Sequence, residues 1–70
     1  MWVSASNGDL VNLDNMESVQ TVGLSVNAQL SADRWITLVQ AASREEASAH
    51  IEKIARALAA GAKYLDIRTP

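Results

Sequence analysis

The residues from Ser43 to Glu46 divide this 70-residue sequence into a strand-like part and a helical part. Ser43 can accept a hydrogen bond from the backbone N–H of Glu46, and the Glu46 carboxylate can reach back to the N–H of Ser43, which forms a capping box. Alanine-rich residues 44–60 follow, and Gly61 stands where helices commonly end. Before Ser43, apolar and polar residues alternate as in half-buried strands. The sequence therefore predicts an α+β fold, in which an antiparallel sheet of about five strands is packed by one helix over residues 44–60.

Residues 2–13 have the pattern of a β-hairpin centred on Asn7-Gly8. Asn-Gly suits a type I′ turn, because both central residues of that turn need a positive φ. A two-residue loop of this kind would place Val3 and Val11 on opposite faces of the hairpin. Both faces would then carry apolar side chains, which predicts that other parts of the protein cover both faces of the hairpin.

Three further strands are expected before the helix, over residues 16–22, 24–30 and 35–41. Gly23 lies between the first two and predicts either a tight turn or a bulge in one bent strand. Alternation within the last strand, the most hydrophobic one, separates two sets of side chains. One face carries Trp35, Thr37 and Val39, and the opposite face carries Ile36, Leu38 and Gln40. A short strand over residues 64–68 would follow the helix and return to the sheet.

The expected helix has an apolar stripe and an outer side with small residues. The stripe that would face the sheet consists of Ala47, Ile51, Ile54, Ala55 and Leu58. The outer side carries Ala49, Ala57 and Ala60, where surface helices more often carry Lys or Glu. Small residues permit close approach of another chain, but alanine is also the best helix former. The outer alanines can therefore indicate either a contact with a partner or helix propensity alone, and both interpretations stay open.

The length of the chain allows a single domain, which we place at residues 1–70. A chain this short buries only about 60% of the surface of its unfolded state, so its core is small. It has no cysteine, which excludes disulfides and thiolate metal sites. The simplest remaining source of stability is a second copy, so we expect a homodimer or higher oligomer.

The charge balance argues against a nucleic-acid-binding protein. The chain has 6 basic and 8 acidic residues and a net charge of −2, whereas nucleic-acid binders usually present a basic face. No run approaches the ~18 apolar residues of a membrane span, and the N-terminus lacks the basic and apolar regions of a signal peptide. Together with the lack of cysteine, these features predict a cytoplasmic protein that does not bind membranes.

The sequence carries no recognisable catalytic, metal-binding or phosphate-binding motif. His50 is the only side chain whose usual pKa lies near neutrality, but no nucleophile accompanies it at a recognisable spacing, so we interpret it as a boundary residue near Glu46. Acidic residues fall near predicted turns without the spacing of a calcium loop. The isolated glycines form neither a Walker A motif nor a dinucleotide fingerprint. We therefore expect no enzyme activity, no metal and no cofactor.

Interface candidates come from the aromatic residues, the last strand before the helix and the outer side of the helix. Tryptophan is enriched in binding hot spots, although most tryptophans lie in the core. Because the helix covers only one face of the sheet, the other face should expose apolar side chains that require a partner. The candidates are Trp35, Thr37, Val39, Trp2, Ala49 and Ala57.

Two segments carry a resemblance to other proteins. GDLVNLDNMESV, from Gly8, and WITLVQAASREEASAHIEKIARAL, from Trp35, resemble a loose class of short bacterial and phage proteins in which a few antiparallel strands precede an S-x-E-E helix. LVNLD is also similar to a strand of LytTR-type DNA-binding domains, but this chain lacks their length and basic surface. In general character the chain is similar to phage-encoded inhibitors of host defence, such as anti-CRISPR proteins.

The resemblance implies an accessory protein of a phage or mobile element that binds and modulates a host protein. The absence of catalytic motifs independently predicts a non-catalytic interaction protein. The alternative is a small-ligand binder, for a nucleotide for example, whose site forms between the subunits of a homo-oligomer.

Overall fold

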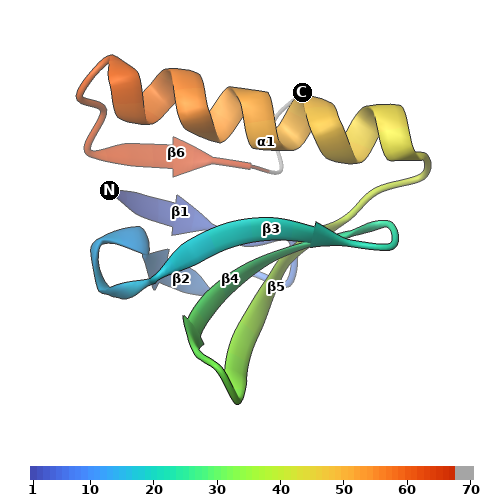
Figure 1. The fold of residues 1–70 in the computed structure, drawn as a ribbon. Coiled ribbons are helices and arrows are strands. Elements are labelled where there is room, and N and C mark those ends of the chain that lie inside the picture. Colours follow the sequence, from blue (N-terminus) through green and yellow to red (C-terminus); the bar gives the residue numbers. More distant parts are fainter. Residues whose placement is uncertain (68–70) are drawn as a thin grey trace.

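Six strands and one long helix make up residues 1–67, which are the part of the chain that the computed structural model describes (Figure 1). This arrangement confirms the α+β class, the position of the helix and the short last strand, although residue 68 of the expected strand lies outside the described residues. The elements, in chain order, are β1 (Trp2–Ser4), β2 (Leu10–Asn12), the 3-10 helix η1 (Leu13–Asn15), β3 (Ser18–Val22), β4 (Ser25–Ser31), β5 (Arg34–Gln40), α1 (Arg44–Ala59) and β6 (Tyr64–Asp66).

The strands form two three-stranded sheets, where the sequence predicted one sheet of about five strands. One sheet has the order β2-β1-β6, with β1 antiparallel to β2 and parallel to β6. The other is the antiparallel sheet β3-β4-β5. The chain changes sheet at η1, where the Asn12 side chain accepts a hydrogen bond from the Asp14 N–H at 3.1 Å and caps the turn. This turn separates β3 from β2, so the two hairpins do not join into one sheet.

The first hairpin has a different register from the predicted one. Val3 pairs with Val11, and the Ala5 N–H donates to the Asp9 carbonyl at 2.8 Å, so the loop holds three residues instead of two. Within this loop only Gly8 has a positive φ, of 95°, as in a three-residue loop whose last residue is left-handed. A shift of one residue moves side chains to the other face. It brings Val3 and Val11 together in the core and leaves Leu10 outside.

The β3–β4 hairpin turns at Gly23, which confirms the tight turn over the bulge. Val22 pairs with Ser25, and Gly23 has a φ of 62° while Leu24 has no positive φ. A positive φ at only the first central residue is the pattern of a type II′ turn, which glycine adopts without steric cost.

A bulge in β5 changes which of its residues are buried. Val26 pairs with Val39 but the next residue, Asn27, pairs with Thr37, so Leu38 has no direct partner. Leu38 and Val39 are therefore both buried, although they are neighbours in a strand. The expectation that Val39 shares the open face of Trp35 and Thr37 is wrong for this reason. The Leu38 carbonyl also accepts from the Ser6 N–H at 2.7 Å, which connects the two sheets.

The core lies between the two sheets and α1. Its fully buried large side chains come from both sheets and from the residue after β6: Leu38, Ile67, Val3 and Val26. The helix contributes Ala47 and Ile54, which are also buried. Figure 1 shows α1 running across one side of the molecule, with β6 beside it and β3 facing it.

Both ends of α1 are capped as the sequence indicates. Ser43 Oγ accepts from the Glu46 N–H at 3.2 Å, while the Glu46 carboxylate accepts from the N–H of Ala42, at 3.3 Å, and not from that of Ser43. At the other end Gly61 has a φ of 73°, and its N–H donates to the Leu58 carbonyl. The Ala62 N–H donates to the Ala57 carbonyl, which completes a Schellman motif.

Candidate binding groove

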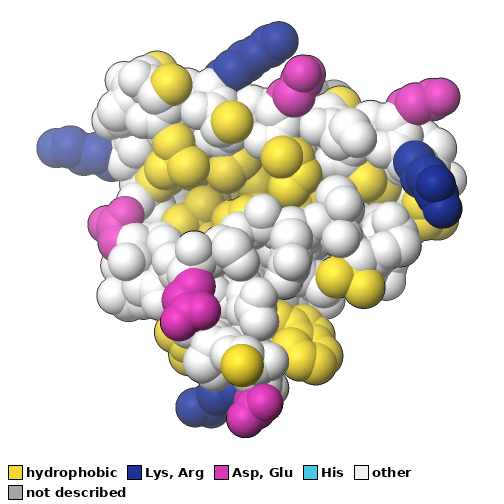
Figure 2. All heavy atoms as spheres, viewed as in Figure 1, with side chains coloured by type: hydrophobic (Ala, Val, Ile, Leu, Met, Phe, Trp, Pro, Cys, Tyr) yellow, Lys and Arg dark blue, Asp and Glu magenta, His cyan; other side chains and the backbone are white. Residues whose placement is uncertain are grey.

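An apolar groove of about 270 Å³ lies between α1 on one side and η1 and β3 on the other. Figure 2 shows hydrophobic side chains gathered along this line, between the helix and the front strand. We call it the α1–β3 groove and define it by Leu13, Met16, Glu17, Ser18, Val19, Ile51, Ile54, Ala55 and Leu58. Glu17 is its only charged residue.

The helix wall of the groove is the edge of the predicted apolar stripe. Ile54 is buried and Ile51 half-buried, as expected, but Ala55 is exposed and Leu58 is 50% exposed. Ala57, which was expected on the outer side, packs against the core instead. The buried face of the helix is thus rotated toward Ala57, and this rotation leaves the Ala55 and Leu58 side open.

The opposite wall comes from η1 and from the edge strand β3. Leu13 is buried, and Met16 and Val19 are half-buried against the core. β3 is an edge strand, paired with β4 on one side only. Met is flexible and polarizable, which suits a wall that adapts to different side chains.

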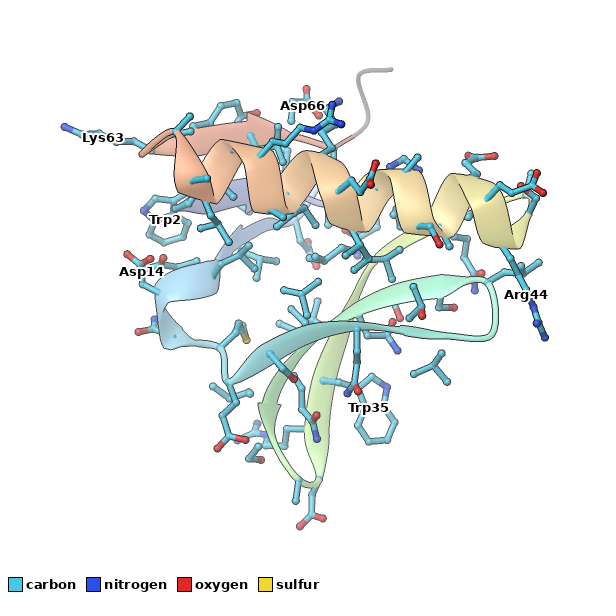
Figure 3. The ribbon with its side chains drawn as sticks, turned by 45° about the horizontal axis from the view of Figure 1, so that its top comes forward. Trp2, Asp14, Trp35, Arg44, Lys63 and Asp66 are labelled. Carbon is cyan, nitrogen blue, oxygen red and sulfur yellow. The ribbon has the colours of Figure 1, made fainter. Side chains whose placement is uncertain are left out.

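A second hollow, of about 280 Å³, lies farther along the same interface at the start of the helix. It is lined by Thr21, Gly23, Arg44, Ala47 and Ser48. Arg44 extends from the first turn of α1 (Figure 3). The interface between α1 and β3 thus has an apolar stretch bordered by Glu17 and a polar stretch bordered by Arg44.

The six predicted interface residues do not form one surface. Trp2 and Trp35 are 45% and 60% exposed, but they belong to different sheets and lie far apart in Figure 3. Thr37 and Ala49 are exposed as well. Val39 is buried in the core, and Ala57 is half-buried against the core.

The sequence did not predict the groove, because the residues that line it were assigned to the buried stripe of the helix or to a strand. Leu58 was placed in the buried stripe and Met16 at the start of a strand. The spacing of Ile51, Ala55 and Leu58 along one edge of the stripe is the signal that could have located the groove. That signal is only interpretable once the rotation of the helix is known.

His50 lies between the buried and the exposed side of α1, as predicted. Its Nε2 atom is 3.6 Å from Glu46 Oε1, which is too long for a hydrogen bond, and this nitrogen is buried without another partner in the described part of the chain. Residues 1–67 contain no group of three or more His, Cys, Asp or Glu side chains that could hold a metal ion.

Among the residues that the structure describes, no helix is both long and apolar enough to cross a membrane. Comparisons with known protein families, curated protein sequences and solved structures found no match.

Proposed function

We propose that this protein is a non-catalytic interaction protein, and that it receives apolar side chains of another polypeptide in the α1–β3 groove. The observation that carries the proposal is Leu58, which remains 50% exposed at the rim of a groove with apolar walls. An exposed apolar patch rimmed by polar residues commonly marks an interaction site. Filling the groove would remove Leu58, Met16 and Val19 from water.

The charges bordering the interface suggest the chemistry of the partner. Glu17 borders the apolar stretch and Arg44 borders the hollow beyond it. A segment with apolar side chains at its centre, a basic residue near Glu17 and an acidic residue near Arg44 would be complementary to both. Complementary charges of this kind mainly increase the association rate and the selectivity.

The experiment places a photo-crosslinking residue at position 58 in cells that make the protein. Leu10 supplies the matched control position, because it is 57% exposed on β2 and does not line the groove. We expect a discrete adduct from position 58 and not from position 10. Mass spectrometry of the adduct then separates a second copy of this chain from a different protein.

The proposal fails if position 58 gives no adduct, or the same adducts as position 10. A Glu17→Lys variant adds a second test, because it should weaken adduct formation at position 58 by repelling the basic residue expected in the partner. If the adduct is unaffected, the groove can still bind the partner, but the charge argument is wrong.

Three narrower expectations stay predictions. They are a host protein as the target of a phage or mobile-element product, a cytoplasmic location, and self-association. The alternative function, a small ligand bound between two subunits, predicts that ligand addition increases the particle mass, which light scattering would detect.

A further inference from the structure

A depression of about 260 Å³, lined by both polar and apolar side chains, lies on the outer face of the β3-β4-β5 sheet and shares no lining residue with the α1–β3 groove. Its six lining residues are Gln20, Val22, Asn27, Gln29, Ala32 and Trp35. Cross-strand pairing brings most of them together, because Gln20 pairs with Asn27, and Gln29 pairs with Trp35. Directly paired residues share one face of a sheet. That face is opposite to the one on which Val26 and Ala28 enter the core.

Asn27 is the unusual member of this depression. It is only 6% exposed, and its Oδ1 atom is buried without a hydrogen-bond partner in the described part of the chain. Buried polar groups are normally hydrogen-bonded, and an unpaired one destabilises the fold. Val would suit a central strand better than Asn at this position. Asn27 therefore fits a binding role better than a structural one.

The neighbouring amides add further hydrogen-bonding groups. Gln29 Oε1 accepts from Gln20 Nε2 at 2.7 Å and from Ser18 Oγ at 3.4 Å. These bonds orient both glutamines and, within the described part of the chain, leave the Gln29 side-chain N–H groups and the Gln20 carbonyl oxygen for a ligand. The depression thus offers donors and acceptors side by side.

Trp35 supplies an aromatic surface beside these amides. Its side chain is 60% exposed, and it points away from the helix in Figure 3. None of the six lining residues is charged. A nucleotide or another phosphate-bearing ligand would call for a cationic group, so the depression suits a neutral ligand.

We propose that this depression binds a neutral sugar ring. Sugar hydroxyl groups donate and accept hydrogen bonds, which matches the three side-chain amides among the lining residues, those of Asn27, Gln20 and Gln29. The C–H face of a pyranose is apolar and can lie against the indole of Trp35. The site is independent of the α1–β3 groove, so either proposal can fail without the other.

The experiment titrates the full chain with methyl glucopyranosides, N-acetylglucosamine and, as a non-sugar ring, adenine, and follows the protein by two-dimensional NMR. We expect weak, saturable shifts of the Trp35 indole N–H and of the Asn27 and Gln29 side-chain amides with at least one sugar. The Trp2 indole, on the other sheet, should not move. Shifts with adenine alone, or saturable shifts with none of the sugars, would overturn the sugar assignment.

Three variants separate binding from folding. Asn27→Val should raise the melting temperature, because it removes the unpaired carbonyl, and should weaken sugar binding about tenfold or more. Trp35→Ala should weaken binding similarly without unfolding the domain, because its ring is mostly exposed. Trp2→Ala is the matched aromatic control and should bind as the wild type does. An Asn27→Val variant that binds sugar normally would show that Asn27 has no binding role.

Discussion

At the residue scale, Leu38 shows how strongly burial depends on local irregularity. It has no direct partner in the β4–β5 ladder, yet its side chain is fully buried and its carbonyl accepts a hydrogen bond from Ser6 in the other hairpin. A bulge inserts one extra residue and bends its strand. Here the extra residue packs into the core, and its backbone connects the two sheets.

We therefore predict that Leu38→Ala lowers the free energy of unfolding by about 2–5 kcal/mol, as for other large-to-small core substitutions. Leu10→Ala is the matched control, because Leu10 is 57% exposed, and it should stay within about 0.5 kcal/mol of the wild type. Urea denaturation followed by circular dichroism measures both values. Equal, small losses in the two variants would contradict the position of Leu38 in the core.

At the scale of elements, the start and end of α1 are determined by its caps more than by its apolar stripe. Ser43 has an extended backbone and accepts from the Glu46 N–H, while Gly61 ends the helix in a left-handed conformation. Such caps satisfy backbone groups that have no partner within the helix.

Ser43→Ala should lower the free energy of unfolding by about 1 kcal/mol, because it removes the side-chain acceptor. For a domain of this size, a loss of 1 kcal/mol lowers the melting temperature by about 4–8 °C. Ser48→Ala is the control, since Ser48 is exposed within the helix and alanine is the better helix former there. Calorimetry should show an unchanged or slightly raised melting temperature for Ser48→Ala. An unchanged midpoint for Ser43→Ala would place the start of the helix elsewhere.

The two faces of β5 allow a second prediction at this scale. Trp35→Ser should lower the free energy of unfolding by less than about 1 kcal/mol, because Trp35 is exposed. Val39→Ser should lower it by about 2 kcal/mol or more, because it leaves both a cavity and a buried hydroxyl. A simple alternating strand predicts similar effects at both positions. Guanidinium denaturation of the two variants distinguishes the bulged strand from the regular one.

At the scale of the whole molecule, one copy of the chain already encloses a core. The Cα radius of gyration is 11.0 Å, close to the value of about 11 Å expected for a compact domain of 70 residues. Large apolar side chains nevertheless remain exposed on several elements, among them Leu58 on α1 and the pair Trp2 and Tyr64 on neighbouring strands. Such surfaces favour association between molecules.

We predict that light scattering at micromolar concentration gives a particle mass above the 7.5 kDa of one chain. Leu58→Glu should lower this mass if the α1–β3 groove makes the contact, whereas Leu10→Glu should not. A monomer of high thermal stability down to low micromolar concentration would contradict self-association. The groove would then have to be occupied by a different protein.

The sequence by itself determined the fold class, the helix and most strand positions. These depend on local chemistry: the Ser43 cap, glycines with positive φ, and the alternation of apolar residues. It did not determine the hairpin register, the division into two sheets, the bulge at Leu38 or the rotation of α1. Each of these depends on which arrangement of distant segments buries the most apolar surface. Local sequence patterns do not reveal which arrangement that is. The same reason explains the sites, because the openness of the groove beside Leu58 and the burial of Asn27 exist only after the sheets and the helix have packed.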